Sequence, residues 1–441
     1  PEESVSGFLY GYVVPQLNRE FDLLRISQNV CLNIELKSTE ISIEKIKRQL
    51  IQNKHFLKLL NKPYLYLFTY ISSTNRAFLL SESDLVECGV AVLAETWGKV
   101  KEAGQTIDLD QVFTPNNILV SPLNATERFL AEDYLLTEHQ ENIKNAIVGY
   151  ICNKVEDRFI GLTGGPGTGK TLLIYDIAHK LAEKNRILIV HSGILCDGHR
   201  ELNQRLNNIK IIAAKELRLR EIVDVDIVIV DEAHRLYTDT LEKIERWVKR
   251  TNATCLFSYD AGQMLSSSEK LRNTSGKIDT LCTGHIYKLT NKIRTNKELA
   301  LFITCLRDLS KYRSEYSFPN VKILFEPQKC EALQVIKKLE IDGYTFISYT
   351  PSLYNYELNY QSSQHNTHNV IGQEFDGVCM LIDDHLYYTP EGRLAGKLHP
   401  NPDYLFEQLL YQGLTRVRRK IALVVTSEEM LCKILPLMGN N

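Results

Sequence analysis

The chain has 441 residues, of which 44% are hydrophobic and 24% are charged, and its formal net charge is −2. This composition excludes a disordered chain, and the length predicts about two or three domains. Without a global excess of positive charge, any nucleic-acid site must be a local basic groove. The ten cysteines stand singly, with no Cys-x-x-Cys pair, which favours reduced thiols in a cytoplasmic protein. The start is not signal-like and no apolar run is long enough to span a bilayer, so no membrane association is expected.

The first candidate site lies near the N-terminus. The pattern predicts a mostly apolar helix over residues 4–17 and then strands around 20–26 and 30–35. Side chains alternate along a strand, so Glu35 and Lys37 share one face, and a hairpin would bring Asp22 close to Glu35. Two carboxylates and an ammonium on one face predict a Mg²⁺ site that activates water against a phosphodiester. The alternative is a solvated strand end.

This arrangement resembles the PD-(D/E)XK nucleases, in their nuclease-related and RecB-type branches, where an Asp is followed one strand later by Glu-x-Lys. The resemblance implies that Asp22 and Glu35 bind Mg²⁺ or Mn²⁺ and that Lys37 is catalytic. In the same family a glutamine-bearing helix follows the motif, which here is the helix expected over residues 43–60 with Gln49. Glu3 would be an additional acidic ligand. The chain departs from the family pattern because Phe21, not Pro, precedes Asp22.

Beyond this site the pattern predicts a strand over residues 64–72 and a helical stretch over 77–103. Residues 104–124 are then polar and irregular and contain Pro115 and Pro122, which is typical of a domain boundary.

A complete P-loop follows an apolar strand that begins at Phe159, and it opens a helix over residues 172–182. Its backbone N–H groups and the helix N-terminus would surround phosphates. Lys170 is expected to reach the β and γ phosphates, and Thr171 to hold Mg²⁺. The alternative is a chance glycine-rich turn. The nucleotide-binding residues expected here are Gly165, Gly167, Thr168, Gly169, Lys170 and Thr171.

The second half of the ATPase signal is an apolar run over residues 225–230 that ends in Asp231-Glu232-Ala233-His234. A continuous apolar run is typical of a central parallel strand. At its end Asp231 is expected to bind Mg²⁺ and Glu232 to polarise the attacking water.

Further motifs follow in a fixed order. Before the P-loop, residues 136–140 read Leu-x-x-x-Gln, and after the acidic pair, residues 256–263 are a strand followed by Asp-x-x-Gln. Three more motifs come later in the chain: Lys-Ile-Arg-Thr-Asn at residues 292–296, Gly-Gln-Glu-Phe-Asp at 372–376 and Leu-Thr-Arg-x-Arg at 414–418. This series resembles superfamily 1 helicases, although Asp-Glu-Ala-His alone suggests superfamily 2. The resemblance implies an adenine contact by Gln140, a γ-phosphate sensor in Gln263, a nucleotide contact by Glu374, and two phosphate-contacting arginines, Arg294 and Arg416. Tyr349 is a candidate for stacking on a base.

The whole pattern resembles a bacterial group in which a nuclease-like domain is fused to a short helicase core related to Schlafen-like proteins. That group includes antiphage nuclease-helicases of the Nhi type. We therefore expect an α/β chain with a PD-(D/E)XK-like nuclease domain over residues 1–105, a linker over 106–130, and RecA-like P-loop domains with parallel sheets over 131–290 and 291–441.

The expected activity is an ATP- and Mg²⁺-dependent DNA helicase or translocase fused to an endonuclease, a nickase that uses Mg²⁺ or Mn²⁺. Its expected partner is single-stranded or nicked DNA, with invading phage DNA as the target. Two alternatives stay open: a nucleic-acid-sensing ATPase switch with a non-cleaving N-terminal domain, and an RNA-directed helicase. The sequence leaves the oligomeric state open.

Overall fold

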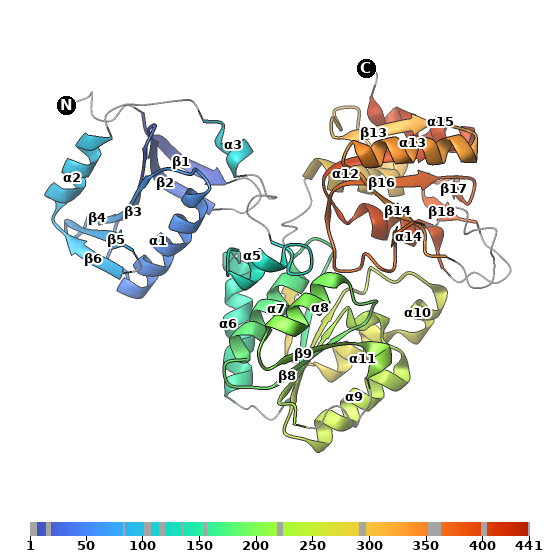
Figure 1. Cartoon of the computed structure of the whole chain (residues 1–441), viewed down its shortest axis with the longest axis horizontal. Coiled ribbons are helices and arrows are strands. Elements are labelled where there is room, and N and C mark those ends of the chain that lie inside the picture. Colours follow the sequence, from blue (N-terminus) through green and yellow to red (C-terminus); the bar gives the residue numbers. More distant parts are fainter. Residues whose placement is uncertain are drawn as a thin grey trace. The chain divides into compact units, whose positions relative to one another are not determined.

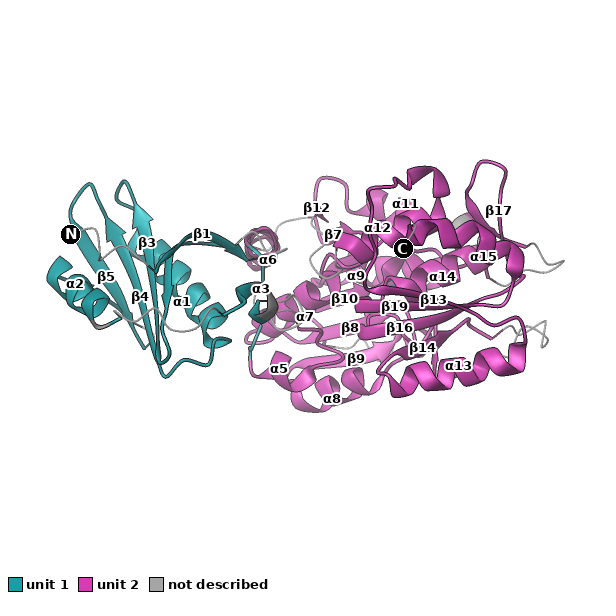
Figure 2. Ribbon diagram, turned by 90° about the horizontal axis from the view of Figure 1, so that it is seen from above, with its two compact units in different colours: residues 1–119, 132–137 teal, residues 120–131, 138–441 magenta. Residues whose placement is uncertain are grey.

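The computed structural model describes residues 7–14, 19–82, 84–100, 107–113, 120–134, 136–153, 157–217, 224–290, 297–351, 363–397 and 404–439. The chain divides into two compact units (Figure 1, Figure 2). Unit 1 comprises Pro1–Leu119 and Glu132–Thr137, and unit 2 comprises Val120–Ala131 and Glu138–Asn441. Within the described ranges, no helix combines the length and the apolar character needed to cross a bilayer.

Unit 1 is built on a six-stranded mixed sheet in the order β1-β2-β3-β4-β5-β6. Its elements are β1 (Leu9–Val14), β2 (Arg19–Ile26), β3 (Val30–Lys37), α1 (Ile43–Lys58), β4 (Tyr64–Ile71), β5 (Arg76–Ser81), β6 (Asp84–Cys88), α2 (Val90–Lys99) and α3 (Leu109–Val112). Strands β3 and β4 are parallel and joined by α1, while the other neighbours are antiparallel. Ile46 and Leu50 of α1 pack in one core cluster, and Leu93 of α2 packs in another with Ile34 and Phe68.

The strands predicted over residues 20–26, 30–35 and 64–72 and the helix predicted over 43–60 are confirmed. The helix predicted over residues 4–17 is wrong over Leu9–Val14, because this segment is rich in aromatic and β-branched residues and pairs with β2 as a strand. Residues 4–6 and 15–17 of that prediction lie outside the described residues. The helix predicted over 77–103 is wrong over its first part, where β5 and β6 form a hairpin through a turn at Glu82 (φ 53°). The apolar run over residues 77–80 fits a buried strand and a buried helix equally well.

Unit 2 contains two α/β lobes, which we call lobe 1 (residues 138–290) and lobe 2 (residues 297–439). A segment that includes α5 (Thr126–Leu130) precedes lobe 1. Lobe 1 consists of α6 (Glu138–Cys152), β7 (Phe159–Gly164), α7 (Lys170–Leu181), β8 (Ile187–His191), α8 (Asp197–Arg205), β9 (Ile209–Ala213), η2 (Ala214–Glu216), β10 (Ile227–Asp231), η4 (Ala233–Arg235), α9 (Thr238–Arg250), β11 (Thr254–Tyr259), α10 (Ser267–Arg272), α11 (Thr274–Leu281) and β12 (Ile286–Leu289).

Lobe 2 consists of α12 (Lys297–Arg307), η5 (Leu309–Lys311), β13 (Val321–Phe325), α13 (Lys329–Ile341), β14 (Thr345–Ser348), β15 (His365–Asn366), β16 (Phe375–Ile382), β17 (Leu386–Tyr388), β18 (Leu394–Gly396), α14 (Phe406–Leu414), β19 (Val417–Val425), α15 (Glu428–Ile434) and η7 (Leu435–Met438). The β17–β18 pair is a small antiparallel sheet of its own.

The main sheet of each lobe is parallel, as the sequence predicted. Lobe 1 has the order β12-β7-β11-β10-β8-β9 and lobe 2 the order β13-β19-β16-β14-β15. All five residues of β10 are buried, and the four before Asp231 are apolar, as expected for a central parallel strand. In an open parallel sheet, ligands bind beyond the carboxyl ends of the strands. That edge of lobe 1 carries the P-loop after β7, Glu232 after β10 and Asp260 after β11.

Candidate nucleotide and metal sites

The P-loop connects β7 to α7. Lys170, at the start of α7, is 7% exposed, and its ammonium donates hydrogen bonds to the carbonyl oxygens of Gly164 (2.7 Å) and Gly165 (3.1 Å). Gly169 has φ 84°, which favours glycine, and a Cβ at this position would overlap the amide nitrogen of Gln140. The loop therefore needs glycine here both for its backbone conformation and for its packing.

Gln140 on α6 holds the P-loop through a hydrogen bond to its backbone. Its side chain is buried and its Nε2 donates to the carbonyl oxygen of Thr168 at 3.2 Å. The Thr168 hydroxyl in turn donates to the carbonyl oxygen of Gly165 at 2.9 Å. Gln140 thus has a place beside the loop, and its adenine contact stays a prediction.

The acidic pair at the end of β10 is buried. Asp231 accepts the Glu232 N–H at 3.0 Å through Oδ1, and its Oδ2 lies 3.3 Å from Nδ1 of His191. Glu232 has φ 55°, a left-handed conformation that is uncommon for a residue with a side chain. Burial acts to raise the pKa of the Glu232 carboxyl, but the neighbouring His234 ring and the positive groups of Arg235, Lys170 and Arg416 outweigh it and lower the pKa to about 2.

His234 fixes the geometry between the two acidic positions. Burial lowers its pKa to about 3, so its ring is neutral. Nδ1 accepts the Asp260 N–H at 3.1 Å, which leaves the ring proton on Nε2, 3.5 Å from Glu232 Oε2. The sequence named His234 within the motif but gave it no role. Arg235, whose Nε lies 3.6 Å from Glu232 Oε2, was missed as well.

Asp260 and Gln263 follow β11 on the same edge. Asp260 Oδ1 accepts the Gly262 N–H at 2.9 Å, and its Oδ2 lies 3.9 Å from Lys170 Nζ. Burial raises the pKa of the Asp260 carboxyl. Gln263 is buried and its main-chain carbonyl oxygen accepts a hydrogen bond from Arg235 at 3.4 Å. Its predicted role as a γ-phosphate sensor stays a prediction.

Glu374 and Arg416 are the predicted nucleotide-contacting residues of lobe 2. Arg416, between α14 and β19, is 7% exposed, and its positive charge acts on the carboxyls of Glu232 and Asp260. Glu374 forms an ion pair with Arg418, whose Nε and Nη2 both lie 3.0 Å from Glu374 Oε2. Arg294 lies outside the described residues.

The side chains at this edge fit a magnesium nucleotide. Thr171 places a hydroxyl in the first turn of α7, and the carboxyl of Asp231 is fully buried. In the part of the chain that the structure describes, Glu232 Oε2 and Asp260 Oδ2 have no hydrogen-bond partner. Buried acidic oxygens without a partner are costly, and a bound cation or an ordered water removes that cost.

A cavity of about 390 Å³ lies between the P-loop and lobe 2. Pro166 borders it on the P-loop side, and Arg307 of α12 stacks on the ring of Tyr411 at 4.2 Å on the lobe 2 side.

Tyr349, the candidate for base stacking, does not line this cavity. It is 7% exposed, donates through its hydroxyl to the Leu381 carbonyl at 2.8 Å and packs edge-on against Phe406. Because the ring belongs to the lobe 2 core, the base-stacking role considered for Tyr349 is wrong.

Unit 1 brings the predicted acidic residues together. β2 and β3 form an antiparallel hairpin, and the Lys37 ammonium lies 3.8 Å from both Asp22 Oδ2 and Glu35 Oε2. Asp22 Oδ2 also accepts the Leu36 N–H at 2.8 Å. Because both carboxylates turn toward one point beside an ammonium, the set fits a divalent cation with oxygen ligands. Glu3 lies outside the described residues.

Three side-chain amides surround the Glu35 carboxylate, which is 1% exposed. Asn33 and Asn53 donate to Oε1 at 3.2 and 2.8 Å, and Gln49 donates to Oε2. The sequence had indicated Gln49 but missed both asparagines. A signal was present, because Asn33 shares the strand face of Glu35 and Asn53 lies one helical turn after Gln49. Burial raises the pKa of the Glu35 carboxyl and the negative charge of Asp22 raises it further. The asparagine amides and Lys37 lower this pKa, but by less.

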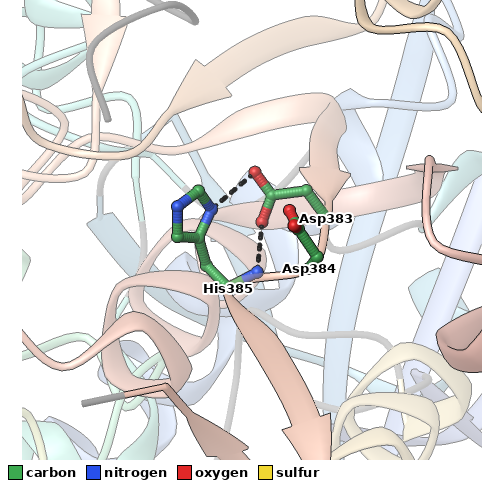
Figure 3. A group of neighbouring side chains, drawn as sticks. All are labelled: Asp383, Asp384 and His385. Carbon is green, nitrogen blue, oxygen red and sulfur yellow. Dashed lines mark hydrogen bonds and ion pairs between the residues drawn. The ribbon is translucent and has the colours of Figure 1, made fainter. Parts of the chain in front are cut away.

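Another group of ligand-type side chains lies at the turn between β16 and β17, formed by Asp383, Asp384 and His385 (Figure 3). Asp383 accepts the His385 N–H at 3.0 Å, and its second oxygen lies 2.9 Å from His385 Nδ1. The His385 ring also stacks on Phe406. The buried carboxylate is therefore engaged inside the turn, and we assign this group to the stability of lobe 2.

Comparison with known proteins gives one family match and several similar structures. Residues 158–326 match the family model described as Schlafen group 3, DNA/RNA helicase domain. No curated protein matches. The chain is similar to a Pif1 helicase from a structure of DNA unwinding at forked double-stranded DNA, with 12% identity, TM-score 0.36, and coverage of 66% of this chain and 92% of that chain. It is also similar to the Pif1 helicase from Candida albicans, with 11% identity, TM-score 0.38, and coverage of 68% and 96%. The family match includes the P-loop and the acids after β10.

Proposed function

We propose that this chain is an ATP-driven DNA helicase or translocase of the superfamily 1 kind whose N-terminal unit is a metal-dependent endonuclease. One observation carries the motor. The positive charge of Arg416, from lobe 2, and that of Lys170, from the P-loop, act on the same two lobe 1 carboxyls, Glu232 and Asp260. Phosphoryl transfer is catalysed by positive groups and an acidic water-orienting group placed around one phosphate.

The residues of unit 2 would share the work of hydrolysis. Thr171 and Asp231 would hold Mg²⁺, which would reduce the negative charge on the phosphates of a bound ATP. Lys170 would exchange its hydrogen bonds to the P-loop carbonyls for the phosphates. Glu232 is ionised at neutral pH because its pKa is about 2, so it would accept a hydrogen bond from the attacking water. Arg416 would stabilise the charge on the transferred phosphoryl group, and the resemblance adds Arg294.

Nuclease activity is proposed for unit 1 because three side chains of the required types meet there. Asp22 and Glu35 would hold Mg²⁺ or Mn²⁺, which lowers the pKa of a bound water when present. Lys37 would orient that water or stabilise the negative charge that develops on the phosphate. The resemblance to antiphage nuclease-helicases supports single-stranded or nicked phage DNA as the substrate.

A specific observation favours a second candidate. The Glu35 carboxylate is already engaged by three amides, which is also what a rigid, non-cleaving binding domain would show. In that case unit 1 only grips nucleic acid or a partner, and the ATPase acts as a conformational switch. An RNA-directed helicase is the third candidate, because the matching family model is described for DNA and RNA helicases alike.

The test measures ATP hydrolysis and plasmid nicking with the full chain, using Mg²⁺ or Mn²⁺ and either single-stranded DNA or RNA. We expect DNA to stimulate hydrolysis, Lys170→Ala to abolish hydrolysis, and Glu35→Ala to abolish nicking while hydrolysis continues. Glu44→Ala, which removes an exposed carboxylate from α1, is the matched control. If Glu35→Ala nicks plasmid as well as the wild type, the nuclease proposal is wrong and the non-cleaving binding domain takes its place. If RNA stimulates ATP hydrolysis more than DNA does, the RNA-directed helicase is favoured.

A further inference from the structure

The segment of residues 120–131, which precedes lobe 1 in the chain, contacts both lobes of unit 2. We call it the strap. On the lobe 1 side its backbone lies directly against α8, where a Cβ on Gly198 would overlap the carbonyl group of Leu123. No other residue type fits at Gly198 without moving the strap. Helix α5 of the strap packs beside α8 (Figure 1).

The strap is also held against α7, the helix that begins with Lys170. Phe129 is fully buried and packs edge-on against the ring of Tyr175 on α7, with the ring centroids 6.3 Å apart. The Thr126 hydroxyl donates to the Pro122 carbonyl at 3.0 Å and closes the turn that leads into α5. At the surface, Arg205 of α8 pairs with Glu127 at 2.5 Å. These contacts make the strap a fixed part of lobe 1.

On the lobe 2 side the strap holds the loop of residues 370–374, which contains the Gly-Gln-Glu of the predicted fifth motif. Asn124 Oδ1 accepts the Glu374 N–H at 3.2 Å, and the Ser121 hydroxyl donates to the same oxygen at 3.2 Å. The Leu123 side chain ends against Gly372, with Cδ1 3.0 Å from the position of a Cβ there. The Glu374 carboxylate is occupied by Arg418, so the backbone N–H is the group through which the strap reaches this residue.

We propose that the strap couples lobe movement to the fifth-motif loop and that Asn124 is the positioning residue of this coupling. The inference rests on the proposed motor function. Because the strap is fixed to lobe 1 and bonded to the lobe 2 loop, a movement of lobe 2 must break the Asn124–Glu374 hydrogen bond, shift the loop or pull the strap from α8.

The size of the effect follows from one hydrogen bond. The net contribution of a neutral hydrogen bond corresponds to roughly a 2- to 12-fold change in an equilibrium constant. We therefore expect Asn124→Ala to raise the DNA concentration for half-maximal ATPase stimulation by about that factor. The basal rate should stay at the wild-type value, because none of the strap contacts described above reaches Lys170, Thr171 or Glu232. Asn124→Asp retains the acceptor oxygen and should restore the wild-type DNA dependence.

The deciding measurement is hydrogen exchange of the full chain with and without Mg²⁺ and a non-hydrolysable ATP analogue. In the wild type, peptides over residues 120–131 and 370–374 should change protection together when the analogue binds. In Asn124→Ala they should change independently, while Glu127→Ala, which breaks only the exposed pair with Arg205, should behave as wild type. Unlinked changes in the wild type, or linked changes in Asn124→Ala, would overturn the inference. If DNA fails to stimulate the wild-type ATPase, the proposed motor function fails, and the exchange result still decides on the strap.

Discussion

The amide cluster around Glu35 predicts a large loss of stability in Asn53→Ala. Asn53 is fully buried and donates to Glu35 Oε1 at 2.8 Å and to Asn33 Oδ1 at 2.7 Å. A hydrogen bond to a charged group contributes about 1.5–3 kcal/mol and a neutral one about 0.5–1.5 kcal/mol, which gives about 2–4.5 kcal/mol for the pair. For a unit of this size, 1 kcal/mol shifts the unfolding midpoint by roughly 4 °C, so the expected decrease is about 8 °C or more.

Differential scanning calorimetry of the full chain without divalent metal measures this decrease. The transition of unit 2 is identified because ATP raises its temperature, which leaves the other transition to unit 1. Lys45→Ala, an exposed change on the same helix, is the control and should move the midpoint little. If the unit 1 transition of Asn53→Ala moves no further than that of Lys45→Ala, the asparagine does not hold Glu35 and the reasoning is refuted.

Three further predictions concern the two sites and acid stability. Arg416→Ala should retain ATP binding but lower turnover by about 10³-fold, since the arginine acts on the transition state. If nucleotide titrations show that ATP affinity falls as much as the steady-state rate, Arg416 is a binding residue instead. Lys37→Ala should retain Mn²⁺ binding by calorimetry but lose nicking rate, and loss of the metal itself would contradict the assigned role. Burial lowers the pKa of His199 to about 2 and of His368 to about 4, so below their unfolded pKa the unfolded chain binds more protons. The free energy of unfolding should therefore fall by about 1.4 kcal/mol per histidine per pH unit as pH decreases below about 6.5. Urea titrations at several pH values measure this dependence, and if it is unchanged in His368→Asn, His368 does not contribute to it.

The fold of unit 2 is more predictable from sequence than that of unit 1, for a physical reason. Parallel strands such as β8 and β10 are buried on both faces, so each is a continuous apolar run between turn signals. In unit 1 the β5–β6 hairpin has a short apolar stretch that suits a helix as well as a strand. Its strand state is decided by pairing with β4, which the local sequence does not contain.

The site residues also differ in how far the sequence predicts their positions. The P-loop and the acids after β10 are contiguous in sequence, so their positions follow from local pattern. Asn53 reaches Glu35 only because α1 packs across the sheet. The bond between Asn124 and Glu374 joins residues that are 250 positions apart, and no periodic pattern links them. The roles of all these residues in binding and catalysis stay predictions.

The left-handed backbone of Glu232 sets two contributions to stability against each other. A residue with a side chain in this conformation costs about 1–3 kcal/mol, which glycine would avoid. Glu232→Gly would also remove the buried carboxylate that faces Arg235 and Lys170, and breaking a buried charge pair costs about 3–5 kcal/mol. Screening a library for survival of heating would therefore retain this glutamate even without selection for turnover.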